Sequence, residues 1–308
     1  MREIRSALIV GAGAIGAAIA SRIFDVDTTA VAICAAGERR DRYIREGFIV
    51  NGKRYFFPLA DPALSAPYDL VIVAVKSYHL TEAIDEMRPY VGPTTIIISL
   101  LNGISSEEIL RAAFSAASIP LAIIISIDAL RVGNKIDFES AGEIRFGFEK
   151  NDPKALADEV ATVAGFFDRH GVQYSIPENM VKVLWFKFMI NVAMNQWSAV
   201  LRGSYRYFQK SASARELVAA TMREVVALSD ALGKGLVQED VATVFATTDR
   251  LNGNGRTSML QDVDALRKTE VEAFAGVVVE KARECGIRAP INEFLLLSIK
   301  AIEEGYGL

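Results

Sequence analysis

A single apolar stretch near the middle of the chain carries three polar side chains at regular spacing. Within residues 184–197, Lys187, Asn191 and Asn195 follow one another at intervals of four, and nothing in the stretch breaks a helix. On an α-helix this spacing places the side chains on one face, with a drift of roughly 40° per step. One ammonium and two amides on a shared stripe could bind the oxygen atoms of a substrate, and the ammonium could also give up a proton.

Two interpretations of this stripe stay open when the stretch is taken alone. A surface helix would turn the three polar groups toward water. A helix that is apolar on nearly all sides is typical of a buried helix, and buried polar groups need partners. In that case the stripe would face an internal cavity that holds a polar ligand.

A second candidate site lies near the N-terminus. Residues 6–10 form a short apolar run typical of a buried parallel strand, and a helical pattern begins at Ala17. Between them lies the motif G-x-G-x-x-G, made by Gly11, Ala12, Gly13, Ala14, Ile15 and Gly16. The first glycine permits a tight turn, the second lets a pyrophosphate approach the backbone, and the third lets helix and strand pack closely. This order of strand, motif and helix predicts that a dinucleotide binds at a helix N-terminus.

The residues after the second predicted strand, 29–34, bear on which dinucleotide binds. An acid there would accept a hydrogen bond from a ribose hydroxyl, and an arginine would bind the extra phosphate of NADP. Two alanines and a glycine come first, and Glu38, Arg39 and Arg40 follow. We expect the arginines to favour NADP, because the guanidinium fork suits a phosphate, while Glu38 argues for NAD. A solvated first helical turn would explain these charges without any ligand.

Two further predicted strands, 69–75 and 94–101, end in polar residues. Lys76 follows the first strand and Asn102-Gly103 follows the second. In open parallel sheets, ligands bind just outside the carboxyl ends of the strands, at the edge where the glycine motif also lies. Taken singly, an ordinary loop lysine and an ordinary turn would explain these residues as well.

Strands alternate with helices up to Pro177, which predicts an α/β fold with a Rossmann-type doubly wound sheet. A hairpin around Asn51-Gly52 and an antiparallel extension over 136–148 belong to it. After Pro177 the pattern is helical, beginning with a helix at 181–201. We therefore predict a dinucleotide-binding domain at 1–177 and an all-α substrate domain at 178–308, with the chemistry in a cleft between them.

The second half adds two candidate residues. A polar loop at 252–257 leads into Ser258, and Glu270 lies in a predicted helix at 264–284. Taken alone, Ser258 is explained as a helix N-cap, and Glu270 as a solvated carboxylate beside basic neighbours.

Composition narrows the class of protein. The chain has 308 residues, which suits two domains, and its net charge of −4 without a dense basic run argues against a nucleic-acid partner. Its apolar runs are too short for a signal or a membrane span, and Cys34 and Cys285 are expected to be free thiols. We therefore expect a cytoplasmic protein with no membrane partner and no metal site. The apolar helices of the second half would suit a homodimer, although core packing explains them equally well.

Together these residues resemble the ketopantoate reductase (2-dehydropantoate 2-reductase) family over nearly the whole chain. The matching positions are the glycine motif, Lys76, Asn102-Gly103, Trp185-x-Lys187-x-x-x-Asn191-x-x-x-Asn195, Ser258-Met259-x-x-Asp262 and Thr269-Glu270. The helical pattern combined with the Ser-Met and Thr-Glu segments is specific, whereas the glycine motif alone would not be. The resemblance implies NADPH-dependent reduction of 2-dehydropantoate to (R)-pantoate, a step toward pantothenate and coenzyme A.

The resemblance also implies roles for individual residues. Lys187 would be the general acid. The implied substrate ligands are Asn102, Asn191, Asn195 and Ser258, with Glu270 as an anchor near substrate and nicotinamide. The implied cofactor contacts are the glycine motif at 11–16, Lys76, Asn102, Ala129 and Glu270.

The chain departs from the family pattern at three places. Ala36 stands where the family often has an arginine, so the preference for NADP depends on Arg39 or Arg40 taking its place. Tyr205 aligns with a further substrate-contacting asparagine of some members. Residues 123–127 are more apolar than the Thr-rich version expected there.

These departures keep two alternatives open. The first is a related reductase, of the same two-domain build, that acts on another 2-oxo acid. The second is a non-enzymatic NADP-binding sensor, which would not explain why Lys187 and Glu270 are both present.

Overall fold

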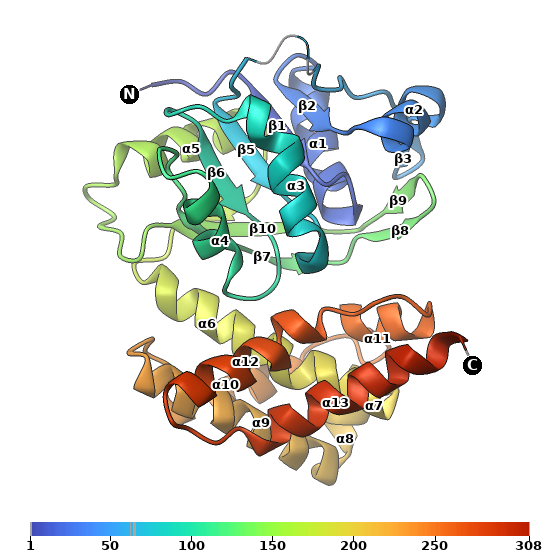
Figure 1. Ribbon diagram of the computed structural model, residues 1–308, viewed down its shortest axis with the longest axis vertical. Coiled ribbons are helices and arrows are strands. Elements are labelled where there is room, and N and C mark those ends of the chain that lie inside the picture. The colour runs from blue at the N-terminus through green and yellow to red at the C-terminus, as the bar shows by residue number, and fades with distance from the viewer. Residues whose placement is uncertain (1, 62, 64–65, 308) are drawn as a thin grey trace. The chain divides into compact units, whose positions relative to one another are not determined.

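The computed structural model describes residues 2–61, 63 and 66–307, and the chain divides into two compact units (Figure 1). The first unit comprises 1–101 and 105–180, and the second comprises 102–104 and 181–308. Strands lie in the first unit, and the described part of the second is helical. The predicted α/β class with a helical second half is therefore confirmed. The segment 102–104 groups with the helices, although it follows a strand of the first unit in sequence.

A four-stranded parallel sheet forms the centre of the first unit. In spatial order it contains β2 (Val31–Cys34), β1 (Ala7–Val10), β5 (Leu70–Val73) and β6 (Ile96–Ser99). Every residue of these strands is buried, which explains why each appears in the sequence as a continuous apolar run. Val10 lies level with Cys34 and with Val73, and Val73 lies level with Ser99. The loops that follow the four strands therefore leave from one edge of the sheet.

Helices cover both faces of this sheet. They are α1 (Ala14–Val26), α2 (Gly37–Glu46), the 3-10 turn η1 (Ser77–His79), α3 (Leu80–Met87), the 3-10 turn η2 (Arg88–Tyr90), α4 (Ser106–Ala113) and α5 (Asp158–Arg169). Ile9 packs in an apolar cluster with residues of α1 and α5, whereas its neighbour Leu8 packs in another cluster with α3 and α4. Because successive strand side chains point to opposite faces, this division gives the doubly wound arrangement that the sequence predicted.

Two smaller sheets extend the first unit. One has the order β11-β10-β7 and the other β4-β3-β9-β8. Their strands are β3 (Phe48–Val50), β4 (Lys53–Tyr55), β7 (Leu121–Ile127), β8 (Leu130–Val132), β9 (Lys135–Asp137), β10 (Ala141–Gly147) and β11 (Tyr174–Ser175). Asn51 and Gly52 have φ angles of 47° and 81°, as a two-residue type I′ hairpin turn requires. The predicted hairpin is therefore confirmed, and so is the antiparallel extension, because β10 pairs with β7.

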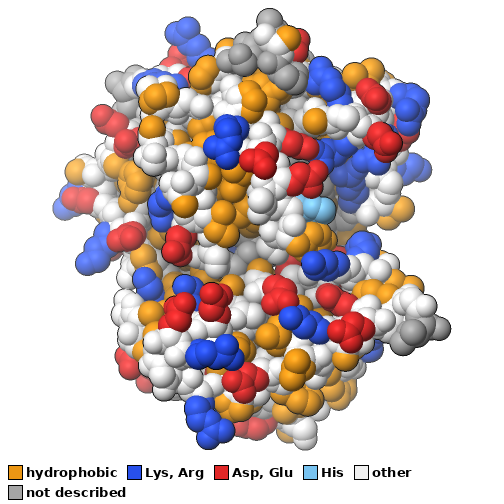
Figure 2. All heavy atoms as spheres, viewed as in Figure 1, with side chains coloured by type: hydrophobic (Ala, Val, Ile, Leu, Met, Phe, Trp, Pro, Cys, Tyr) orange, Lys and Arg blue, Asp and Glu red, His pale blue; other side chains and the backbone are white. Residues whose placement is uncertain are grey.

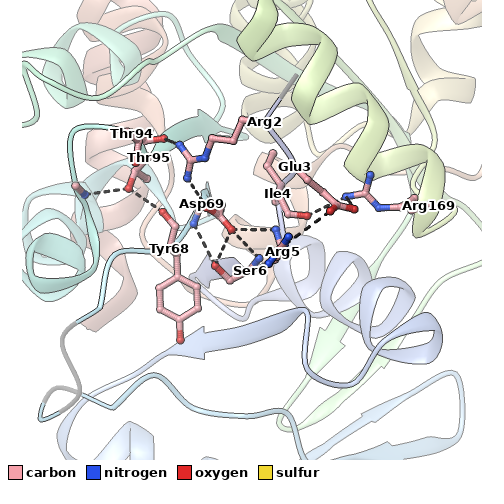
Figure 3. A network of polar contacts seen from close by, with 11 residues as sticks. Arg2, Glu3, Ile4, Arg5, Ser6, Tyr68, Asp69, Thr94, Thr95 and Arg169 are labelled. Atoms are coloured by element: carbon pink, nitrogen blue, oxygen red, sulfur yellow. Dashed lines mark hydrogen bonds and ion pairs between the residues drawn. The ribbon is translucent and has the colours of Figure 1, made fainter.

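The N-terminal segment is tied to this unit through the carboxylate of Asp69, which lies just before β5 (Figure 3). The backbone N–H groups of Arg5 and Ser6 donate to Asp69 Oδ2 over 2.9 and 3.2 Å, and the Arg2 guanidinium pairs with Oδ1. Burial alone would raise the pKa of Asp69, but these donors and the positive charge hold it below its usual value of 3.8. The ionised carboxylate therefore stabilises the folded state.

Asp69→Asn should lower the free energy of unfolding by about 1–2 kcal/mol at pH 7, because charge-assisted hydrogen bonds are lost. The folded-state pKa lies below the unfolded value, so this stabilisation is present above pH 3.8 and is lost as the pH falls through the folded-state value. Urea denaturation of wild type and Asp69→Asn should therefore converge in acid. Asp41→Asn removes an exposed carboxylate and serves as the control. A difference that stayed constant with pH would contradict this account.

The second unit is built from helices around its own apolar core. In chain order the elements are α6 (Met180–Ile190), the π segment η3 (Asn191–Asn195), α7 (Gln196–Leu201), α8 (Tyr205–Lys210), α9 (Ala212–Ala231), α10 (Gln238–Thr248), α11 (Ser258–Asp264), the 3-10 turn η4 (Val271–Ala273), α12 (Ala275–Glu284), α13 (Pro290–Glu304) and the 3-10 turn η5 (Gly305–Gly307). Phe188 and Met189 of α6 are buried in this core with Phe274 and Ile299. The apolar stretch is therefore a buried helix, and the alternative of a surface helix is wrong.

Two predicted helices are not continuous. The helix expected at 181–201 contains the π segment, and the helix expected at 264–284 is interrupted between α11 and α12. In that gap Leu266 has a left-handed backbone with φ 52°, and the Thr269 hydroxyl accepts a hydrogen bond from the Val271 N–H over 3.2 Å. Such local side-chain bonds compete with the helical pattern, which explains the break.

Two general expectations concern the whole chain. Cys34 and Cys285 are free thiols, as predicted. Among the helices that the structure describes, none combines the length and the apolar character needed to cross a bilayer.

Candidate active site

Five of the predicted site residues form one polar group in the second unit. We call this group, made of Asn102, Asn191, Asn195, Ser258 and Glu270, the amide cluster. Asn102 Nδ2 donates to Glu270 Oε2 over 3.2 Å, and Asn191 Nδ2 donates to Asn102 Oδ1 over 3.4 Å. Asn195 Nδ2 lies 3.5 Å from both Asn191 Oδ1 and Ser258 Oγ. These distances are at the long end of the hydrogen-bond range, so a polar ligand could replace them at small cost.

The π segment explains how one stretch of helix presents its polar residues together. An α-helix has fewer than four residues per turn, so Asn191 lies slightly more than one turn after Lys187. A π turn closes through i→i+5 bonds and is wider, so Asn195 lies slightly less than one turn after Asn191. The two drifts are opposite in sense and partly cancel. Asn195 therefore returns toward the face that carries Lys187, which is half-buried.

Glu270 is held by the break between α11 and α12. Its exposed fraction is 4%, so the alternative of a solvated helix carboxylate is wrong. It directly precedes η4, and the backbone N–H of the neighbouring Thr269 donates to Glu303 Oε1 over 2.6 Å. The break that the sequence did not predict thus orients the carboxylate toward Asn102.

Ser258 begins α11 but is not its N-cap. Thr257 has that role, because its hydroxyl accepts a hydrogen bond from the Leu260 N–H over 3.2 Å. Thr257 Oγ1 also bonds Ser198 Oγ over 3.0 Å, which fixes the start of α11 against α7. The N-cap explanation of Ser258 is therefore wrong, and its side chain lies near Asn195.

Three residues that support this site were not predicted. Thr257 and Thr269 fix the segments that carry Ser258 and Glu270, and Glu303 anchors the second of these segments. The only signal in the sequence was a pair of hydroxyl residues before an apolar run, which identifies a cap without saying which member provides it.

Tyr205 is the first residue of α8 and contacts the loop that precedes Ser258. Its N–H donates to the carbonyl oxygen of Gly255 over 3.0 Å, and burial raises the pKa of its hydroxyl. The side chain is half-buried. A bulky aromatic residue therefore lies beside the segment that leads into the amide cluster.

In the first unit, the three motif glycines have the geometry that a dinucleotide site needs. Gly11 has a φ of 96°, which favours glycine, and a Cβ on Gly16 would lie 2.1 Å from the carbonyl oxygen of Gly11. A Cβ on Gly13 would meet no described atom within 4 Å. Open space at Gly13, directly before the uncharged first turn of α1, fits a pyrophosphate at the helix N-terminus.

Gly13→Ala should therefore leave the fold intact and weaken dinucleotide binding at least about tenfold, because the added methyl occupies the space that a pyrophosphate needs. Thermal unfolding and a fluorescence titration with NADPH would measure the two effects. Gly165→Ala is the matched control, since its added Cβ would make only an ordinary contact 3.8 Å from Arg169 Nη1. Unchanged NADPH affinity in Gly13→Ala would argue against a pyrophosphate at this turn.

Two further predicted cofactor residues also lie in the first unit. Lys76 follows β5, is half-buried, and accepts a hydrogen bond at its carbonyl oxygen from the His79 N–H over 2.9 Å. Ala129 lies between β7 and β8 and packs at the edge of the apolar core. Nearby, the Arg131 guanidinium of β8 donates to the carbonyl oxygen of Ala12 in the glycine motif. Nothing in the sequence indicated this arginine, because its contact joins segments that are far apart in the chain.

The two arginines expected to select NADP lie in the first turn of α2. Figure 2 shows basic side chains gathering where Figure 1 places this helix, which contains four arginines. Arg39 pairs with the carboxylate of Glu86, with its Nη2 2.5 Å from Oε1, and Arg40 donates to the carbonyl oxygen of Ala60 over 2.7 Å. Glu38 and Ala36 are exposed. Both arginines thus already have partners within the first unit.

Two surface cavities lie away from all of these residues. One of about 880 Å³ lies in the first unit beside Arg111 and Phe114, and one of about 480 Å³ lies in the second unit beside Arg215 and Phe245. None of the predicted site residues lines either of them.

Comparison with known proteins follows the same division of the chain. Residues 7–151 match the model of the ketopantoate reductase family PanE/ApbA, and residues 179–303 match the model of its C-terminal part.

The chain belongs to the ketopantoate reductase family. It is 25% identical over 305 residues to the 2-dehydropantoate 2-reductase of Pyrococcus horikoshii, with 97% of each chain covered. Membership makes the protein an oxidoreductase that uses a nicotinamide dinucleotide.

Solved structures show the same fold. A family ketopantoate reductase from Ralstonia eutropha superimposes with a TM-score of 0.84 at 22% identity, covering 98% of this chain and 100% of the other. D-mandelate dehydrogenase, solved with NADH and anilino(oxo)acetate, superimposes with a TM-score of 0.86 at 21% identity and the same coverage. At these identities the likeness concerns the fold alone, and the family fold thus accommodates different 2-oxo acids.

Proposed function

We propose that the protein catalyses the NADPH-dependent reduction of 2-dehydropantoate to (R)-pantoate, a step toward pantothenate and coenzyme A. The observation that carries this proposal is the amide cluster, which follows Lys187 on one face of a buried helix. A 2-oxo acid with a hydroxyl group offers several oxygen atoms, and such a cluster can bind them through neutral donors and acceptors.

Lys187 acts as the general acid in this proposal. The bound nicotinamide supplies a hydride to the carbonyl carbon of the substrate. Negative charge then grows on the carbonyl oxygen, where the Lys187 ammonium stabilises it and donates the proton that completes the alcohol. General acid catalysis of this kind accelerates a reaction by roughly 10²–10⁴-fold.

The amide cluster orients the substrate. Asn191, Asn195 and Ser258 donate to and accept from its carboxylate and hydroxyl groups. Glu270, which is buried and bonded to Asn102, accepts a hydrogen bond from the substrate hydroxyl and favours the charged form of Lys187. Asn102 and Glu270 also contact the cofactor.

The first unit holds NADPH through the glycine motif, Lys76 and Ala129. The tip of β2 supports NADP, because it has no acid to accept from a ribose hydroxyl and is followed by Arg39 and Arg40.

A second candidate function is the reduction of another 2-oxo acid. Tyr205 supports it, because an aromatic residue beside the loop at 252–257 can favour a different substrate side chain. The fold that is shared with D-mandelate dehydrogenase supports it too.

Absorbance of the reduced nicotinamide distinguishes these candidates. We expect rapid loss with 2-dehydropantoate and NADPH, and slower loss with NADH. A panel of aliphatic and aryl 2-oxo acids should be tested in parallel. Faster turnover of an aryl 2-oxo acid would favour the second candidate, and no loss with any acid would contradict the proposed reaction.

A further inference from the structure

An ion pair lies at the point where the cofactor's adenosine ribose is expected. Arg39 is in the first turn of α2, five residues after Cys34 ends β2. Its Nη2 lies against both carboxylate oxygens of Glu86, which belongs to α3. The exposed fractions of the two side chains are 38% and 20%, so the pair is partly shielded from water.

The placement of Glu86 is determined by the packing of its helix. Leu80, Ala83, Ile84 and Met87 of α3 are buried against the sheet. The Glu86 carbonyl oxygen accepts a weak hydrogen bond from Cys34 Sγ over 3.8 Å, so the residue lies beside the tip of β2. The pKa of the Cys34 thiol is raised to about 12 by burial and, secondarily, by the Glu86 charge, which agrees with this proximity.

We propose that Glu86 is a specificity-determining residue, which weakens binding of a 2′-phosphorylated dinucleotide by holding Arg39. The inference rests on the proposed cofactor site. In Rossmann folds the ribose 2′ group lies just beyond the second strand, where an arginine binds the phosphate of NADP. A guanidinium already paired with a carboxylate has to exchange that partner for the phosphate. The Glu86 charge also repels the incoming phosphate dianion.

The position of Ala36 increases the importance of this pair. A short apolar residue at the strand tip offers the 2′ position neither an acid nor a base, so discrimination between the two cofactors falls to the charges just beyond it. Arg40, the other candidate, donates to the carbonyl oxygen of Ala60. The balance between Arg39 and Glu86 therefore sets the ratio of NADPH to NADH affinity.

The test is equilibrium binding without turnover. Dissociation constants for NADPH and NADH, and for the fragments adenosine 2′,5′-bisphosphate and AMP, are measured for wild type, Glu86→Gln, Arg39→Gln and the double variant. We expect Glu86→Gln to tighten NADPH binding about tenfold, with NADH changed less than about twofold, because only the 2′-phosphate gains a charge-assisted partner. Arg39→Gln should weaken NADPH binding, and adding Glu86→Gln to it should restore nothing.

Asp85→Asn is the matched control, because it removes the same charge from the neighbouring residue of α3, whose carboxylate pairs with Arg88. The inference is overturned if Glu86→Gln leaves the NADPH to NADH ratio unchanged, or if the Asp85 or double variant shows the same shift. Failure of wild type to bind either dinucleotide would overturn it together with the proposed cofactor site. A shifted ratio without reduction of 2-dehydropantoate would support it and reject only the proposed substrate.

Discussion

Lys187→Ala should lower kcat by at least about 10²–10⁴-fold, because the proposed reaction loses both its proton donor and the charge that stabilises the carbonyl oxygen. The NADPH dissociation constant should stay within about twofold, since the cofactor is assigned to the glycine motif of the first unit and the expected loss is confined to the chemical step. Steady-state kinetics with 2-dehydropantoate, combined with a fluorescence titration with NADPH, measures the two quantities separately.

Lys182→Ala is the control for this substitution. It removes an ammonium from the same helix, and Lys182 pairs with Asp240 at 3.3 Å, outside the amide cluster. We expect it to retain most of the turnover. Near-normal turnover in Lys187→Ala, or an equal loss in both variants, would show that Lys187 is not the proton donor.

Glu270→Gln should lower kcat/KM by about 10- to 100-fold, because a charge-assisted hydrogen bond is worth about 1.5–3 kcal/mol. The carboxylate accepts from Asn102 Nδ2, and an amide in its place offers one acceptor and one donor. In the proposed reaction it also accepts from the substrate hydroxyl. We therefore expect KM for 2-dehydropantoate to rise and kcat to fall, while thermal unfolding changes little because the shape of the side chain is kept.

Glu272→Gln is the matched control for Glu270→Gln. Glu272 lies two residues away in η4, is largely exposed, and pairs with Lys300 at 2.5 Å. Its substitution should leave kcat/KM within about twofold, as is usual for exposed ion pairs. If both variants lost activity equally, the effect would come from η4 as a whole and not from the buried carboxylate.

Local patterns were enough to predict most of the first unit. Continuous apolar runs identified the parallel strands, because strands buried on both faces have no polar side. The glycine motif was predictable because each glycine meets a local backbone requirement, and the same holds for the turn at Asn51-Gly52. The prediction of two units of different class also came from periodicity alone.

The second unit shows where such patterns fail. A π segment and an α-helix have nearly the same hydrophobic pattern over five residues, so the widening at 191–195 was not visible in the sequence. The break before Glu270 depends on Glu303, more than thirty residues later, which bonds the Thr269 N–H. Helical periodicity therefore predicted one continuous helix where tertiary contacts end it.

The sequence by itself determined the order of strands and helices, the glycine motif, and which polar residues belong to the candidate site. These features follow from residue type and short-range spacing. Tertiary structure alone decided that Asn102 joins Asn191 and Glu270, and that Arg39 is paired with Glu86. Those contacts join segments that are distant in the chain, and their existence depends on how helices pack against a core, which no local pattern records.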